Sequence, residues 1–144
     1  MKTLRTGFGL AAALLSASGL ALAAVPHTAA PSGAAVYFIE LADGATVGQT
    51  FTVKFGLKGM GVAPAGIDAP ATGHHHLLID LEDAPAMNQP LAMTDSLRHF
   101  GKGQTETELS LPPGTHTLQL LVGDNNHVPL VPPVISKKIT VTVQ

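Results

Sequence analysis

The sequence predicts an all-β protein, an immunoglobulin-like antiparallel β-sandwich of about seven strands. Three observations favour this fold class. Short runs alternate between apolar and polar side chains, which is typical of half-buried strands. Sequences rich in glycine and proline separate these runs and predict turns. No long run shows the helical periodicity of about 3.6 residues, so two packed sheets are expected to bury the apolar faces.

The first three strands are expected before residue 82. Residues 36–41 are rich in β-favouring side chains and end at the turn sequence Asp43-Gly44. Residues 50–57 alternate phenylalanine, valine and leucine with polar residues, as a half-buried strand does. Residues 74–81 alternate in the same way, and this strand begins with three consecutive histidines.

Four further strands complete the predicted domain. They are separated by Gly-Lys-Gly, Pro-Pro-Gly and a proline-containing loop. The expected strands are 97–100, 104–111, 115–122 and 134–143. Two long connections remain: residues 58–73 form a loop rich in glycine and proline, and residues 82–96 form a connection with room for one helical turn.

The N-terminal residues have the pattern of a secretory signal peptide. Lys2 and Arg5 precede an apolar run over 8–22, and small residues flank a cleavage site before Ala24. This run is shorter than the about 20 residues that span a bilayer, so cleavage is favoured over a retained anchor. The expected organisation is a signal peptide over 1–23, a flexible leader over 24–35 and a single β-sandwich domain over 36–144. A periplasmic or secreted location follows.

Composition excludes several functional classes. Loss of Lys2 and Arg5 leaves six basic and ten acidic residues, a formal charge of −4, which argues against nucleic acid or an anionic membrane surface as partner. The chain has no cysteine, so it has neither disulfides nor thiolate metal sites. No G-x-S-x-G motif or phosphate-binding glycine loop is present, and no catalytic residue is assigned.

Five of the seven histidines are expected at one end of the sandwich, and one of them, His75, points away from the other four. In a strand, His74 and His76 project from the same face. If successive strands run in opposite directions, His99 at the end of the fourth strand and His127 in the last loop lie at that same end. His116 starts the sixth strand and belongs to the opposite end.

This set of imidazoles predicts a transition-metal site at His74, His76, His99 and His127. Imidazole suits Cu(II), Zn(II) and Ni(II), so copper or zinc is the expected cofactor. Asp68 and Asp124, in neighbouring loops, are candidates for carboxylate ligands or for groups that orient the histidines. His75 and His116 share faces with leucines, so we expect structural roles in which they tie loop backbone to the sheet.

Several motifs together resemble one family of small exported bacterial proteins, the domain of unknown function DUF4399. The motifs lie in 42–47, 53–62, 72–80, 99–106 and 111–120. The resemblance covers nearly all of 36–143 and implies an exported location and a domain boundary, but no mechanism. The Ala-Asp-Gly-Ala-Thr-Val opening at 42–47 is also similar to the start of CopC-type periplasmic copper-binding sandwiches, although the N-terminal histidine ligand of that class is missing here.

Three functional hypotheses follow. The leading one is a binding module that holds a transition metal or a small ligand in the histidine cluster. The alternative is a structural or protein-interaction module of the cell envelope, with the histidines as hydrogen-bonding groups. An enzyme with three histidines around an open metal position is the third, and it needs a general base such as Asp68 or Asp124. We expect a binding protein and not an enzyme.

Overall fold

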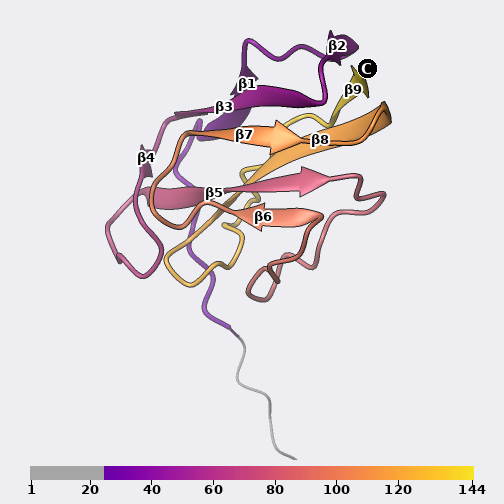
Figure 1. Cartoon of the computed structure of the whole chain (residues 1–144). Coiled ribbons are helices and arrows are strands. Elements are labelled where there is room, and N and C mark those ends of the chain that lie inside the picture. Colours follow the sequence, from indigo (N-terminus) through magenta and orange to yellow (C-terminus); the bar gives the residue numbers. More distant parts are fainter. Residues whose placement is uncertain (1–24) are drawn as a thin grey trace, which may run out of the picture.

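A computed structural model describes residues 25–144 (Figure 1). The predicted signal peptide, residues 1–23, lies outside the described residues. Residues 25–144 contain nine strands and no helix, so the all-β prediction is confirmed, and 82–96 connects two strands through turns alone. None of the described residues belongs to a helix able to cross a membrane. The strands are β1 (Ala35–Ile39), β2 (Ala45–Val47), β3 (Thr50–Lys58), β4 (Gly61–Val62), β5 (Thr72–Ile79), β6 (Leu97–His99), β7 (Glu106–Ser110), β8 (Gly114–Gly123) and β9 (Ile139–Val143).

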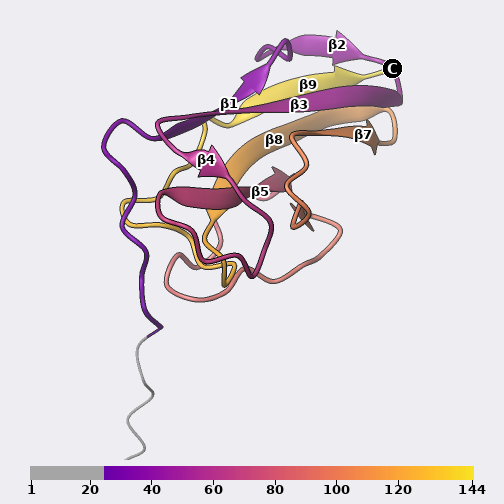
Figure 2. The same cartoon turned by 90° about the vertical axis from the view of Figure 1, so that its left-hand side faces the viewer.

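The strands form two sheets that pack face to face (Figures 1 and 2). The smaller sheet has the order β1-β3-β7 and is antiparallel. The larger sheet is curled and has the order β2-β9-β8-β5-β4. Strand β6 is outside this order and also pairs with β5. One edge of β5 is thus shared between β4 at its start and β6 farther along.

The larger sheet differs from the expected one in two respects. The pairs β2–β9 and β4–β5 are parallel, so the strictly antiparallel prediction is wrong for them. Strands this short, two or three residues, show no periodicity in a sequence. In the immunoglobulin arrangement the fourth of seven strands lies in one sheet with the first, second and fifth. Here the fourth predicted strand is β6, and it pairs with β5, the third predicted strand. The immunoglobulin-like assignment is therefore not confirmed.

The segment before β1 makes contacts with the rest of the domain. The Ala30 N–H donates to the Val131 carbonyl at 2.8 Å, and the Val131 N–H donates to the Thr28 carbonyl at 2.9 Å. Ala30 and Ala34 pack against the main core. The packed domain therefore includes part of the segment expected to be a flexible leader.

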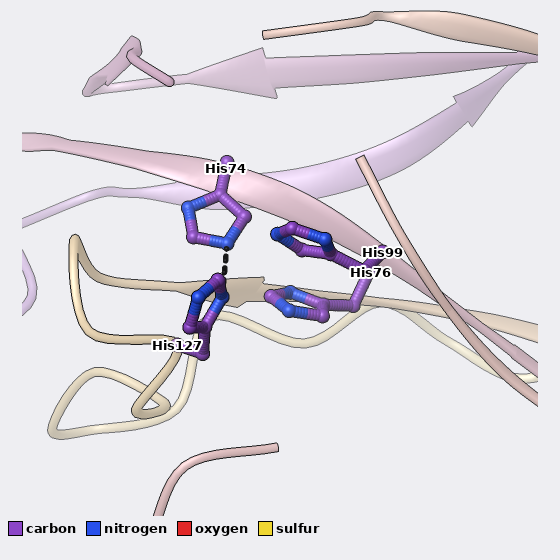
Figure 3. Close-up of side chains that lie close together, drawn as sticks. All are labelled: His74, His76, His99 and His127. Atoms are coloured by element: carbon purple, nitrogen blue, oxygen red, sulfur yellow. Dashed lines mark hydrogen bonds between the residues drawn. The ribbon is translucent and has the colours of Figure 1, made fainter. Parts of the chain in front are cut away.

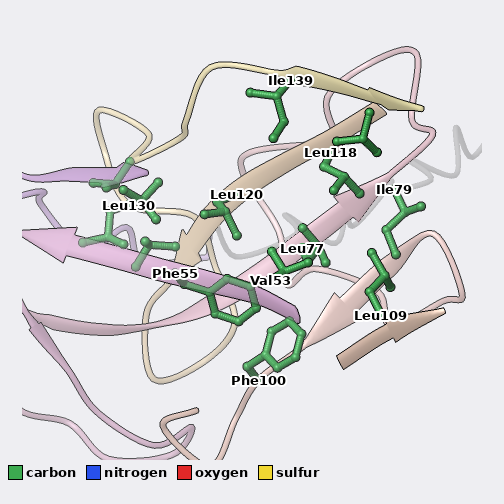
Figure 4. Packing of buried hydrophobic residues seen from close by; sticks show 14 residues of the cluster. Val53, Phe55, Leu77, Ile79, Phe100, Leu109, Leu118, Leu120, Leu130 and Ile139 are labelled. Carbon is green, nitrogen blue, oxygen red and sulfur yellow. The ribbon is translucent and has the colours of Figure 1, made fainter. Parts of the chain in front are cut away.

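The main core lies between the two sheets (Figure 4). Val53 and Phe55 of β3 face Leu77 of β5 and Leu120 of β8, and all four are at most 2% exposed. Full burial of one such side chain stabilises the fold by about 1.5–3 kcal/mol. Because side chains alternate along β3 and β8, their apolar residues face the opposite sheet, and the burial of these residues holds the two sheets together.

A second, smaller core covers the outer face of the curled sheet. Leu78 of β5, Leu97 of β6 and Leu121 of β8 pack with Leu91 from the long connection between β5 and β6. Both faces of β5 are therefore covered, and every residue from Gly73 to Ile79 is buried. The three histidines of this strand therefore have no access to bulk water, whichever way they point.

Candidate metal centre

Three consecutive histidines of β5 are fully buried and point to opposite faces of the strand. His74, His75 and His76 each have 0% exposure. His75 projects into the main core, where its ring centroid lies 5.2 Å from that of Phe55. His74 and His76 project from the outer face, with ring centroids 4.8 Å apart. The alternation of a strand thus separates one core histidine from two candidate ligands.

Strand β6 brings His99 to the same face. In the antiparallel pair β5–β6, His99 lies directly opposite His76, and their ring centroids are 5.2 Å apart. Directly paired residues present their side chains on the same face of a sheet. His99, at the end of its strand as expected, therefore reaches the site by cross-strand pairing with His76 within one sheet.

The loop after β8 supplies His127. The His127 N–H donates to the Asp124 carbonyl at 3.0 Å, and the Asp124 N–H donates to the Val128 carbonyl at 2.9 Å, which closes a tight turn. His127 has a φ of 65°, in the left-handed region that non-glycine residues seldom adopt. Its carbonyl accepts the Leu91 N–H at 2.9 Å. These contacts hold the backbone in a conformation that directs the imidazole toward β5.

The four side chains meet in one group (Figure 3). We call His74, His76, His99 and His127 the four-histidine cluster. Each residue offers one ring nitrogen, and these nitrogens all lie within 4.8 Å of one another. His74 Nε2 and His127 Nδ1 are 3.1 Å apart and share one hydrogen bond. Nitrogens around a tetrahedral ion with bonds of about 2.0–2.1 Å stand about 3.4 Å apart, so only a small contraction would place four ligands on one ion.

Four of the eight ring nitrogens of the cluster are buried without a hydrogen-bond partner. His74 Nδ1, both nitrogens of His76 and His99 Nε2 are buried and unpartnered. Buried polar groups in folded proteins are nearly always satisfied, and each one left unpaired costs about 1–3 kcal/mol. A bound metal ion would be the partner of one of these nitrogens in each of His74, His76 and His99. The donor set therefore fits a cation.

The environment keeps the imidazoles of His74, His76 and His99 neutral near pH 7. Burial lowers the pKa of His74 to about 4, with His99 and His127 adding to the effect. Burial, and then the neighbouring histidines, lower the pKa of His76 to about 3. The pKa of His99 is lowered too, by burial and by His127. Neutral imidazole is the form that ligates metals, so these histidines need release no proton before binding.

Two glycines leave the space that the rings occupy. A Cβ at Gly101 would lie 2.2 Å from His99 Cε1, and one at Gly123 would lie 2.8 Å from His76 Cε1. Neither glycine was predicted as a site residue. The available signal was weak: glycine in or beside a strand marks a close approach of something to the backbone, but it does not identify what approaches.

The two predicted carboxylates lie in different surroundings. Asp68 is exposed and does not belong to the group of candidate ligands. Asp124 is 3% exposed, and its carboxylate accepts the N–H groups of Asn126 and Val128 at 2.9 and 3.0 Å. Asp124 is therefore a loop-forming residue beside the cluster and not one of its ligands.

The two histidines expected to be structural also differ. Neither nitrogen of His75 has a hydrogen-bond partner of good geometry. Burial lowers the pKa of His75, but the Gln104 loop backbone lies near enough to oppose this with a smaller, raising effect. His75 is therefore mainly a packing residue of the core, with at most a weak link to loop backbone. His116 does form a hydrogen-bonded link: its Nδ1 lies 2.7 Å from Asp80 Oδ2 and its Nε2 lies 2.9 Å from the Pro112 carbonyl. It is near the start of β8, away from the cluster, as expected.

Comparison with known proteins gives one family whose match includes the four-histidine cluster. A family model described as "Domain of unknown function (DUF4399)" matches residues 53–144, which include all four histidines. No curated protein matches the chain. Among solved structures, an endo-beta-1,4-mannanase from Thermotoga petrophila is similar over 77% of this chain, with 17% identity and a TM-score of 0.42. The matched part is 20% of the mannanase chain, so this protein spans about a fifth of that enzyme's length.

Proposed function

This chain belongs to the DUF4399 family, and we propose that it is a binding module that holds one transition-metal ion in the four-histidine cluster. Two observations carry the proposal: each of the four histidines brings one ring nitrogen within 4.8 Å of the others, and His74, His76 and His99 have buried ring nitrogens without a hydrogen-bond partner. A cluster of hydrogen-bonding histidines in a structural module would be expected to have its nitrogens satisfied. A cation would give one of these nitrogens in each of His74, His76 and His99 a partner.

Copper or zinc is the ion that this donor set favours. All four donors are imidazoles, and nitrogen-rich sites suit Cu(II) and Zn(II) better than the oxygen-preferring Mg²⁺ or Ca²⁺. If all four histidines bind, the coordination of a tetrahedral ion is complete, and no position is left for a substrate or an activated water. We therefore propose binding, transport or storage of the ion and not catalysis.

The proposed place of action is outside the cytoplasm. The support is the tripartite pattern of residues 1–23, with its basic start, apolar centre and small residues at the cleavage site. A module at that location would meet metal ions as they enter or leave the cell. Its mild acidity, a formal charge of −4 without the first 23 residues, also favours cations over anionic partners.

The direct test is calorimetric titration of tag-free residues 24–144, cleared with a chelator, with Zn(II) and Cu(II). We expect binding of one ion per chain with a Kd below about 1 μM, equivalent to about −8 kcal/mol. The double variant H74A/H76A should lose this binding, because it removes two of the four donors. The single variant H127A, in a loop, should weaken binding without altering β5.

The matched control is H27A, which removes an exposed histidine outside the cluster. It should bind like the wild type. Circular dichroism of each variant reports whether the β-sheet signal is retained. Weak, non-saturating binding by the wild-type protein, or full binding by folded H127A and by the double variant, would contradict the proposed function.

A further inference from the structure

One buried acidic residue lies beside the cluster without a cationic partner. Asp124 is the only buried carboxylate among residues 25–144. The ion pairs found in that part of the chain are Lys54–Glu40 and His116–Asp80, and neither includes it. Buried charges in proteins are normally paired with an opposite charge or a metal, because an isolated ion loses its hydration on burial. The charge of Asp124 thus has no visible counterpart.

The hydrogen bonds of Asp124 are those of an ionised carboxylate. Oδ1 accepts the backbone N–H groups of Asn126 and Val128, and Oδ2 accepts the Thr28 hydroxyl at 2.7 Å. An ionised carboxylate only accepts hydrogen bonds, and all three partners here can donate. These three bonds orient the group but supply no positive charge.

Asp124 also stands where it can act on the metal centre. Gly123, the residue before it, pairs directly with His74 across β5 and β8. The Asp124 carbonyl accepts the His127 N–H, so the same residue closes the turn that presents a candidate ligand.

We propose that Asp124 is the counter-charge of the metal centre and the positioning residue for His127, and that Thr28 in the N-terminal segment holds its carboxylate in place. This inference rests on the proposed function. Four neutral imidazoles bring no charge to the ion, so a divalent cation would keep its full charge in a buried site. The carboxylate of Asp124 balances part of that charge from the next layer of residues, where such groups tune metal affinity.

The link to Thr28 makes the N-terminal segment part of the site. Thr28 is 96 residues from Asp124 in sequence. Its carbonyl accepts the Val131 N–H, and the nearby Ala30 N–H donates to the Val131 carbonyl, so this segment is held beside Val131. The segment therefore passes over the loop that contains His127 and is fastened to the carboxylate of that loop. Loss of this contact should free the carboxylate and lower the affinity for the ion, although no ligand is altered.

The test compares Zn(II) and Cu(I) affinities, measured by competition with chromophoric chelators, for the wild type, D124N, T28V and T28S. D124N keeps the shape and can keep all three hydrogen bonds, because the threonine hydroxyl can accept from the new amide, so it removes the charge alone. We expect D124N to weaken Zn(II) by about 10-fold or more, within the range seen for residues behind metal ligands. Cu(I), with half the charge, should lose less. T28V should weaken Zn(II) severalfold, and T28S should match the wild type.

The outcomes separate this inference from the proposed function. Wild-type protein that binds none of Zn(II), Cu(II) and Cu(I) overturns both. Wild-type protein that binds, together with D124N of equal Zn(II) affinity or with equal losses for Zn(II) and Cu(I), overturns the counter-charge role alone. T28V affects an exposed position, so it tests the link even if D124N is recovered unfolded, and T28V with wild-type Zn(II) affinity overturns that link.

Discussion

At the scale of single residues, the cluster depends on two glycines, Gly101 and Gly123, as well as on the four imidazoles, because a side chain at either glycine would collide with a histidine ring. Gly123 stands on the strand next to β5, and a Cβ there would meet His76 Cε1 at 2.8 Å and the His127 carbonyl carbon at 3.4 Å. One added methyl group would therefore press on two candidate ligands from different elements. Close packing leaves them little room to move aside.

G123A should accordingly weaken metal binding and lower stability by about 1–3 kcal/mol, the usual cost of overpacking a well-filled site. Titration with Zn(II) and thermal unfolding measure the two effects. G48A is the matched control, since a Cβ at Gly48 has only the Thr50 carbonyl oxygen within reach, at 3.9 Å. Zn(II) affinity that is unchanged in G123A would show that the rings occupy other positions in solution.

At the scale of elements, β5 is fastened to its neighbours differently at its two ends. At its start, the outer-face histidines meet β6 and the loop after β8. Just beyond its other end, Asp80 accepts the Thr117 N–H at 2.8 Å and contacts the His116 ring at 2.7 Å. The second ring nitrogen of His116 faces the Pro112 carbonyl, an acceptor. With an acceptor at each nitrogen, the protonated imidazole is the favoured form.

The pH dependence of this link has a definite sign. The hydrogen bond to Asp80 raises the pKa of His116, so its stabilising effect is complete below the unfolded pKa of about 6.5 and is lost as pH rises through the higher folded pKa. H116Q should lower the Tm more at pH 5.5 than at pH 9. The difference should stay within about 1 kcal/mol, because solvent screens the exposed Asp80. An equal loss of Tm at both pH values would contradict this.

At the scale of the whole molecule, three neutral buried histidines make the metal-free fold sensitive to acid. Burial lowers the pKa values of His74 and His75 to about 4 and that of His76 to about 3. Below about pH 6.5 the unfolded chain takes up protons at these positions while the folded chain does not. Stability is therefore present above that pH and is lost as the pH falls toward 4.

Each of these histidines should cost on the order of 1–2 kcal/mol at pH 5 relative to pH 8. Denaturant unfolding of the metal-free protein between pH 4.5 and 8 measures the slope. H75L removes one of them from the apolar core without altering the cluster. Its unfolding should therefore take up about one proton fewer, and its free energy of unfolding should fall less steeply with falling pH. A slope in H75L identical to that of the wild type would contradict the assignment of His75 as a buried, neutral group.

The all-β class, most strand positions and the four histidines as a set could be predicted from the sequence, because these depend on local alternation and on residue chemistry. His74 and His76 share a face in any strand, and no tertiary information was needed to pair them. The sequence could not determine that β6 lies beside β5, that β2 and β4 pair in parallel, or that Gly101 and Gly123 leave room for the rings. Strand order depends on how long connections are packed, and such packing leaves no periodicity in the chain. Only the tertiary structure brought Thr28 to Asp124 across 96 residues, because a contact between two loops is decided by the shape of the whole fold.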